Sequence, residues 1–149
     1  MLTAKDIMTI DVVTVQPEML VEDLAALLYE KKIGGAPVIA DGQLLGVVTE
    51  NDLIDQTKNL HIPTVLTLLD SVFVLGNPNK MDKEFQKMAG RTVHDIFSGE
   101  LVTVGETTPL NEIATVMAEK KVHTLPVVDG DKLLGVVGKA DLIKAIANR

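Results

Sequence analysis

The sequence contains no cysteine, which excludes disulfides and thiolate metal sites and fits a reducing compartment. It also lacks tryptophan and has only one tyrosine and three phenylalanines, too few rings to form a stacking platform for single-stranded nucleic acid. Basic residues are outnumbered: the net charge of −7 argues against binding to a phosphate backbone. We therefore expect no nucleic-acid partner.

Long apolar segments are missing as well. No apolar run approaches the roughly 18 residues of a membrane-spanning helix, and the first residues lack the apolar core of a signal peptide. The 149 residues have a globular composition, with 46% apolar and 23% charged residues. We expect a cytoplasmic protein that does not insert into membranes.

The chain repeats itself. Residues Asp6 to Ile54 align with Asp95 to Ile143 at a constant offset of 89, without a gap, and 19 of the 49 aligned pairs are identical. Chance similarity rarely keeps one register for so long, so one structural unit is used twice. The duplication predicts a pseudo-two-fold pair with clefts between the copies, where small molecules tend to bind. We divide the chain into a first copy (1–56), an insert (57–90) and a second copy (91–149).

Each copy reads as helix, strand, helix, strand, strand, helix. A strong turn signal, Asp41-Gly42, predicts a hairpin in the first copy, and Asp129-Gly130-Asp131 predicts its equivalent. Apolar periodicity and capping residues predict the other elements. In the first copy these are a helix from the cap Thr3 through Met8, a strand at Val12 to Val15, a helix from about Leu20 to Lys32, and a helix that starts at Thr49. The second copy should end with a helix from about Lys139 to Ala147.

The insert has no counterpart in either copy. Pro63 and Gly76 bracket one predicted helix, and Asn77 and Gly90 bracket a second. The pair either meets a partner or covers one side of the module. The first of these helices is apolar on too many sides to be solvated alone, so we expect it to be buried against another surface.

The repeated pattern resembles a tandem pair of cystathionine-β-synthase-type (CBS) domains, known as a Bateman module. The signature GhhTxxD is complete in the first copy from Gly46 to Asp52, and Pro37-Val38 precedes the hairpin. The resemblance implies an α+β or α/β fold in which two β-α-β-β-α repeats pair with pseudo-two-fold symmetry, here with a helical insert. It also implies clefts for adenosine ligands, assembly into dimers and regulation of a partner protein.

The residues of the signature suit an adenosine ligand. A helix that starts at Thr49 presents backbone N–H groups and a partial positive charge to a phosphate, and Asp52 offers carboxylate acceptors to a ribose diol. The same spacing also suits a plain capping box, and both interpretations can hold together. Four apolar side chains are predicted to line the adenine pocket: Ile10, Val12, Ala36 and Val47.

The second copy departs from the signature because Gly138 stands where the threonine is expected. A weaker second site, or a place for phosphates that cross from the first, is predicted at His123, Val136, Lys139 and Asp141. The resemblance implies a basic residue near phosphate at His123, with a half-buried polar residue as the alternative. Lys139 can also be an ordinary surface lysine.

No catalytic or metal-ligand spacing is visible, and the three histidines lie far apart in the sequence. We therefore expect a non-catalytic regulatory module that binds AMP, ADP or ATP and signals the ligand state to an effector protein. S-adenosylmethionine, NAD and cyclic di-AMP are alternative ligands. A homodimer is expected because the apolar helix faces need cover. A ligand-free dimerisation scaffold is the first alternative function, and an enzyme subunit is the second.

Overall fold

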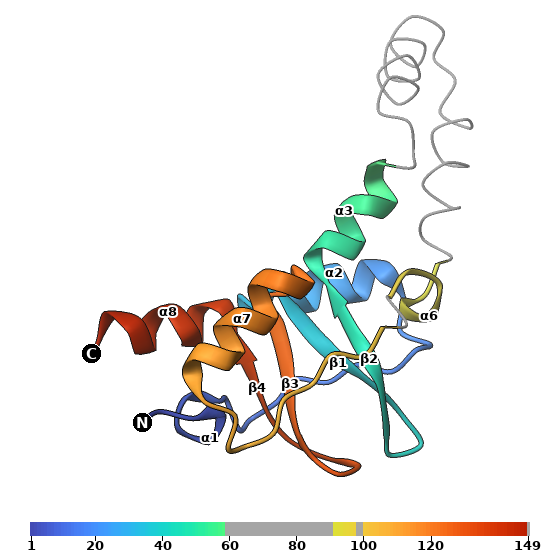
Figure 1. The fold of residues 1–149 in the computed structure, drawn as a ribbon. Helices are drawn as coiled ribbons and strands as arrows, with labels where there is room; N and C mark the ends of the chain where they lie inside the picture. Colours follow the sequence, from blue (N-terminus) through green and yellow to red (C-terminus); the bar gives the residue numbers. More distant parts are fainter. Residues whose placement is uncertain (59–90, 98–99, 149) are drawn as a thin grey trace, which may run out of the picture.

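The computed structural model describes residues 1–58, 91–97 and 100–148 (Figure 1). Two similar copies lie beside each other, each with a two-stranded antiparallel sheet and its helices. The first contains α1 (Ala4–Ile7), α2 (Val21–Lys31), β1 (Gly35–Ala40), β2 (Gln43–Thr49) and α3 (Glu50–Lys58). The second contains α6 (Val93–Ile96), α7 (Leu110–Lys120), β3 (Thr124–Asp129), β4 (Lys132–Gly138) and α8 (Lys139–Ala147). The two predicted helices of the insert lie outside the described residues.

Capping residues set where the short helices begin. In α1 the backbone N–H and the hydroxyl of Thr3 both donate to Asp6 Oδ2, at 2.8 and 3.1 Å, which confirms Thr3 as the cap. Thr92 and Asp95 repeat this box at the same distances in α6. Because each carboxylate accepts two hydrogen bonds from its threonine, the pKa values of Asp6 and Asp95 are lowered.

Tight two-residue turns close both hairpins. Asp41 and Gly42 have φ values of 51° and 75°, the two positive angles of a type I′ turn. In the second hairpin only Gly130 has positive φ, at 59°, as expected at the first central position of a type II′ turn. Both hairpins keep the same register, with Pro37 opposite Val47 and Pro126 opposite Val136.

The strand predicted at Val12 to Val15 is shorter than expected. Only Val15 pairs with a strand, through a parallel bridge to Val38, and Val104 makes the matching bridge to Val127. The Val12 N–H donates instead to Ile10 O at 2.9 Å, so Val12 belongs to a local three-residue turn. The first strand of each copy is thus reduced to a single bridge.

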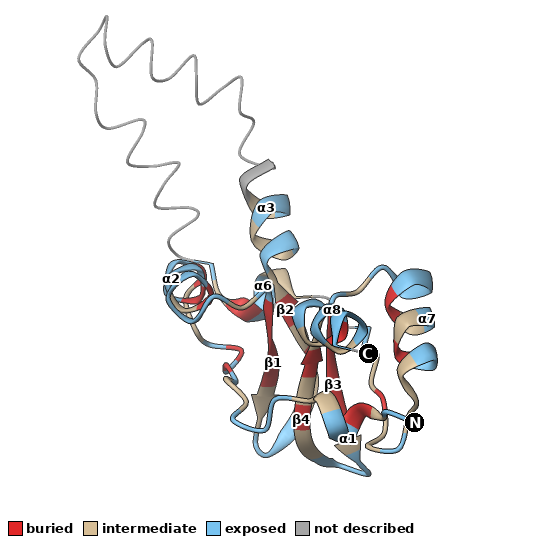
Figure 2. Cartoon of the chain, turned by 90° about the vertical axis from the view of Figure 1, so that its left-hand side faces the viewer, coloured by how far each residue is buried: buried red, intermediate tan, exposed pale blue. Residues whose placement is uncertain are grey.

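Each hydrophobic core contains residues from both copies, and the buried positions are shown in Figure 2. Ala4 of α1 is fully buried in the core of the second copy, and Val93 of α6 is fully buried in the core of the first. Backbone bonds hold the exchange: Ala4 N–H donates to Thr108 O at 2.9 Å, and Val93 N–H donates to Met19 O at 2.8 Å. Because each short helix packs against the other copy, neither copy completes its core alone.

Candidate functional site

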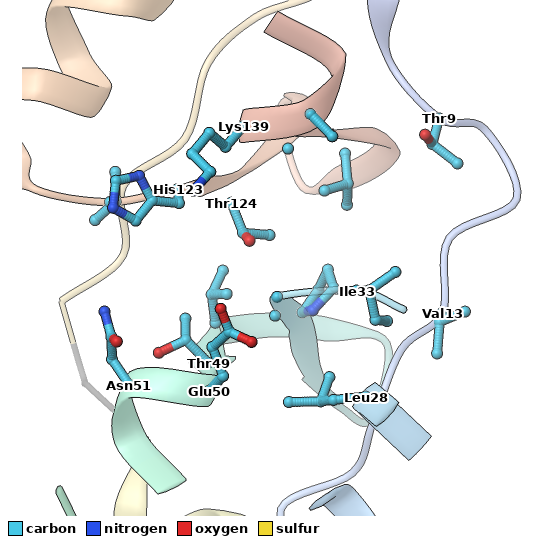
Figure 3. Close-up of a pocket in the computed structure, with 18 of the residues that line it drawn as sticks. Thr9, Val13, Leu28, Ile33, Thr49, Glu50, Asn51, His123, Thr124 and Lys139 are labelled. Carbon is cyan, nitrogen blue, oxygen red and sulfur yellow. The ribbon is translucent and has the colours of Figure 1, made fainter. Parts of the chain in front are cut away.

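A cleft of about 1230 Å³ lies between the copies (Figure 3). Its walls come from both halves of the sequence, including the ends of β2 and β4 and the starts of α3 and α8. Most of the predicted site residues line it: Val12, Val47, Thr49, Asp52, His123, Val136, Lys139 and Asp141. The fold therefore brings together groups that are far apart in the chain.

Thr49 and Asp52 form a capping box at the start of α3. The Thr49 N–H donates to Asp52 Oδ2 at 2.9 Å, and the Thr49 hydroxyl lies 3.2 Å from the same oxygen. The Asp52 N–H donates back to Thr49 Oγ1 at 3.3 Å. The capping interpretation is therefore confirmed. Neither bond to the carboxylate uses Oδ1, so this oxygen can accept a hydrogen bond from a ligand hydroxyl.

Burial shifts the titration of the Asp52 carboxyl. Its pKa is raised, first because the half-buried group is desolvated and then because of the nearby charge of Asp55, while its bonds to Thr49 act in the opposite direction. The net rise means that the folded environment disfavours the ionised carboxylate. A half-buried carboxylate of raised pKa in a cleft is the kind of group that a ligand hydroxyl would stabilise.

Some backbone donors at the helix starts already have partners. The Glu50 N–H donates to Gly34 O and the Lys139 N–H donates to His123 O, each at 2.9 Å. The N–H groups of Glu50 and Asp52 are therefore not free for a phosphate, contrary to what the sequence suggested for the start of α3. A phosphate at this position would have to share or replace those bonds.

The predicted adenine pocket is only partly assembled. Val12 and Val47 line the cleft, but Ile10 and Ala36 do not. Ile10 is 73% exposed to solvent outside it. Ala36 is fully buried in the first core because neighbouring residues of a strand face opposite sides. The cleft side of β1 carries Gly35 and Pro37 instead.

Several cleft residues were not predicted as part of the site. They lie at the end of α2, in the loop before β1, and at the starts of α3 and β3: Leu28, Tyr29, Lys32, Ile33, Glu50 and Thr124. Glu50 directly follows the signature threonine Thr49, so the motif itself would have indicated a position beside the cleft. The loop positions have no comparable sequence signal.

The second end of the cleft keeps the aspartate but lacks the hydroxyl. The Gly138 N–H donates to Asp141 Oδ2 at 2.8 Å, which matches the bond from Thr49 to Asp52. His123 is exposed rather than half-buried, and Lys139 is exposed at the first position of α8. The second end is therefore poorer in donors from its signature but richer in positive charge.

The copies lie close together at Gly35 and Thr124, which are equivalent positions of the repeat. A Cβ atom on Gly35 would lie 2.9 Å from Thr124 Oγ1 and 3.1 Å from Val48 O. Only glycine fits there without displacing backbone. Thr124 itself is 92% buried, with a relative exposure of 8%. Both residues of this contact line the cleft.

Within residues 1–58, 91–97 and 100–148, no three histidine or acidic side chains are grouped closely enough to hold a metal ion. In the same described ranges no helix has the length and apolar character needed to cross a membrane.

Comparison with known proteins gives consistent similarities. The family model of the CBS domain matches residues 4–58 and again 93–148. Protein MJ1426 of Methanocaldococcus jannaschii is 30% identical over 151 aligned residues, covering 95% of this chain and 89% of the relative. The chloroplastic CBS domain-containing protein CBSX2 of Arabidopsis thaliana is 32% identical, over 88% of this chain and 57% of its own length.

A crystal structure of CBSX2 in complex with AMP superposes on this fold with a TM-score of 0.70 and 31% identity, covering 98% of this chain and 96% of the solved one. The inosine-5′-monophosphate dehydrogenase of Thermoplasma acidophilum is 26% identical over 89% of this chain, but only 21% of the enzyme is matched. The chain therefore spans most of MJ1426, just over half of CBSX2 and a small part of that enzyme.

Proposed function

The chain belongs to the CBS-domain family, and we propose that it is a non-catalytic regulatory module whose cleft binds an adenosine-containing ligand. The observation that carries this proposal is the pairing of two helix starts, each with its aspartate, in one cleft between the copies. A partner protein of unknown identity would read the ligand state. AMP, ADP and ATP are the proposed ligands, with S-adenosylmethionine, NAD and cyclic di-AMP as alternatives.

The ribose is assigned to Asp52. Its Oδ1 accepts from the ribose hydroxyls while Oδ2 stays in the capping box. Hydrogen bonds to an ionised acceptor are among the stronger kind, and they are stronger still in a partly desolvated site. The AMP complex of the related CBSX2 supports an adenine nucleotide as the ligand.

The position of the ribose determines where the adenine base and the phosphates would bind. Val12 and Val47 offer an apolar surface to adenine. On the opposite side of the cleft, Lys139 offers positive charge to the phosphates and His123 offers an imidazole N–H donor (Figure 3). The missing hydroxyl at Gly138 makes a ribose on Asp141 the weaker arrangement, so we expect one dominant site per chain.

Two measurements on the purified protein test the proposal. The protein is first denatured, and the supernatant is examined for released adenine absorbance. A thermal-shift panel of AMP, ADP, ATP, NAD, S-adenosylmethionine and cyclic di-AMP follows. A ligand at 100 times its dissociation constant should stabilise the fold by roughly 2.7 kcal/mol, which raises the melting temperature by about 5–10 °C. No copurified adenine compound and no shift with any ligand would favour a ligand-free scaffold instead.

Assembly into a homodimer is also proposed. Apolar side chains at matched positions of α3 and α8, Ile54 and Ile143, are 61% and 57% exposed, and Ile146 on α8 is 52% exposed. Helix faces of this kind are normally covered by another surface. Light scattering at micromolar concentration should give twice the chain mass of 16.1 kDa. The mass of a single chain would contradict the dimer.

A further inference from the structure

The two copies carry opposite charges at matched positions in the cleft. Glu50 is the first residue of α3 and Lys139 is the first residue of α8, and the repeat offset makes them equivalent. Gly34 and His123 form a second matched pair, directly before β1 and β3. All four residues line the cleft. One end therefore has a carboxylate where the other has an ammonium group and an imidazole.

The backbone is the same at both ends, so the side chains make the difference. Each helix starts with an N–H that donates to the matched loop carbonyl at 2.9 Å, Glu50 to Gly34 and Lys139 to His123. Glu50 Oε1 lies 3.7 Å from the position of a Cβ on Gly34, so the carboxylate lies beside the position that matches the Cβ of His123 in the other copy. Glu50 and Lys139 lie on opposite sides of the cleft (Figure 3).

Most of the other cleft charges are matched between the two ends. The remaining lysines of the cleft, Lys32 and Lys121, are equivalent in the repeat, and so are the acidic pairs Asp52 and Asp141, and Asp11 and Glu100. Glu30 also lines the cleft, whereas its equivalent Glu119 does not, so Glu30 adds negative charge from the first copy. These matched pairs add the same field at each end. The Glu50–Lys139 and Gly34–His123 exchanges therefore polarise the cleft along the line between the two helix starts.

We propose that Glu50 is a specificity-determining residue, which selects the ligand by its charge and, together with Lys139, fixes the ligand's direction in the cleft. This proposal rests on the proposed nucleoside site at Asp52. Glu50 repels phosphate groups from the start of α3, and Lys139 with His123 attracts them to the start of α8. Across several ångströms of partly solvated space, one unit charge changes the affinity for a singly charged group by about threefold to tenfold.

Neutralising each charge separately tests the proposal. Glu50→Gln and Lys139→Gln are compared with wild type by titration calorimetry, using adenosine, AMP, ATP and inorganic tripolyphosphate in magnesium-free buffer of low ionic strength. Glu22→Gln serves as the control, because Glu22 is an exposed carboxylate of α2 outside the cleft. Glu50→Gln should tighten ATP binding by about threefold to tenfold or more, with a smaller gain for AMP. Lys139→Gln should weaken both, and added salt should reduce each difference.

Two of the probes, uncharged adenosine and charged tripolyphosphate, separate this proposal from the proposed function. Adenosine carries no phosphate, so its affinity should not change in either variant, and its failure to bind wild type would count against the nucleoside site alone. Tripolyphosphate carries no nucleoside, so opposite responses to Glu50→Gln and Lys139→Gln would support charge selection even then. Charge selection is overturned if ATP and tripolyphosphate behave alike in wild type and both variants, including the case in which neither binds.

Discussion

Replacing Asp52 with asparagine should separate ligand binding from folding. The asparagine side-chain oxygen can still accept from the Thr49 N–H, which now lies 2.9 Å from Oδ2, so the helix cap survives. The carboxylate is half-buried and its pKa is raised by desolvation, so removing the charge also removes an unfavourable burial. These effects oppose each other, and the free energy of unfolding should change by less than about 1 kcal/mol.

Binding should suffer far more than folding. Hydrogen bonds to a charged acceptor contribute about 1.5–3 kcal/mol, so loss of the carboxylate should weaken adenosine binding by roughly tenfold to a hundredfold. Asp141→Asn is the matched control, since Asp141 makes the same bond to Gly138 at 2.8 Å. It should weaken binding less. Calorimetric titration measures the affinity and urea unfolding measures the stability.

The pH dependence gives an independent check on Asp52. A ribose hydroxyl donates to the ionised carboxylate, so adenosine affinity should fall as the pH falls through the raised pKa of Asp52, above its ordinary 3.8. The same raised pKa makes the contribution of Asp52 to unliganded stability fall as the pH rises through that window. Asp52→Asn should abolish the pH dependence of adenosine binding. Equal adenosine affinity in wild type and Asp52→Asn would refute the ribose assignment.

Three further changes test the surrounding structure. Gly138 has the extended φ of −97° that suits a threonine cap, so Gly138→Thr should raise the free energy of unfolding in urea by up to about 1 kcal/mol. A lower free energy of unfolding would count against a repeated cap at this position. Gly35→Ala should lower the free energy of unfolding by about 1–3 kcal/mol because its Cβ would meet Thr124, whereas Gly34→Ala should be nearly neutral. Equal decreases in the two variants would contradict the close contact between Gly35 and Thr124. Asp95 has a lowered pKa, so its ionised carboxylate contributes stability above pH 3.8 that is lost as the pH falls. In acid unfolding, Asp95→Asn should make the stability depend less on pH. An acid midpoint equal to that of wild type would contradict this role of Asp95.

Elements with strong local signals could be predicted from the sequence. The final helix was expected from Lys139 to Ala147, and α8 has these bounds. The turn at Asp41-Gly42 was also correct, because few residue pairs adopt two positive φ angles in succession. The pairing of the copies followed from the repeat itself. In these places local preference and the overall fold agree.

Features that depend on contacts between the copies were missed. Nothing in the residues around Ala4 indicates that α1 completes the core of the second copy, because the bond to Thr108 joins positions far apart in the chain. The error at Ala36 has a different origin. Period-two alternation places it opposite Gly35 and Pro37, on the core side of β1, and applying that rule would have excluded it from the cleft.

A crystal structure of the protein with the nucleotide that gives the largest thermal shift tests the central claim most directly. The account predicts one dominant nucleotide per chain in the cleft, with the ribose within hydrogen-bonding distance of Asp52 Oδ1. It also predicts that the phosphates point toward His123 and Lys139. A nucleotide bound outside the cleft, or a ribose held by Asp141 with the phosphates beside Glu50, would contradict it.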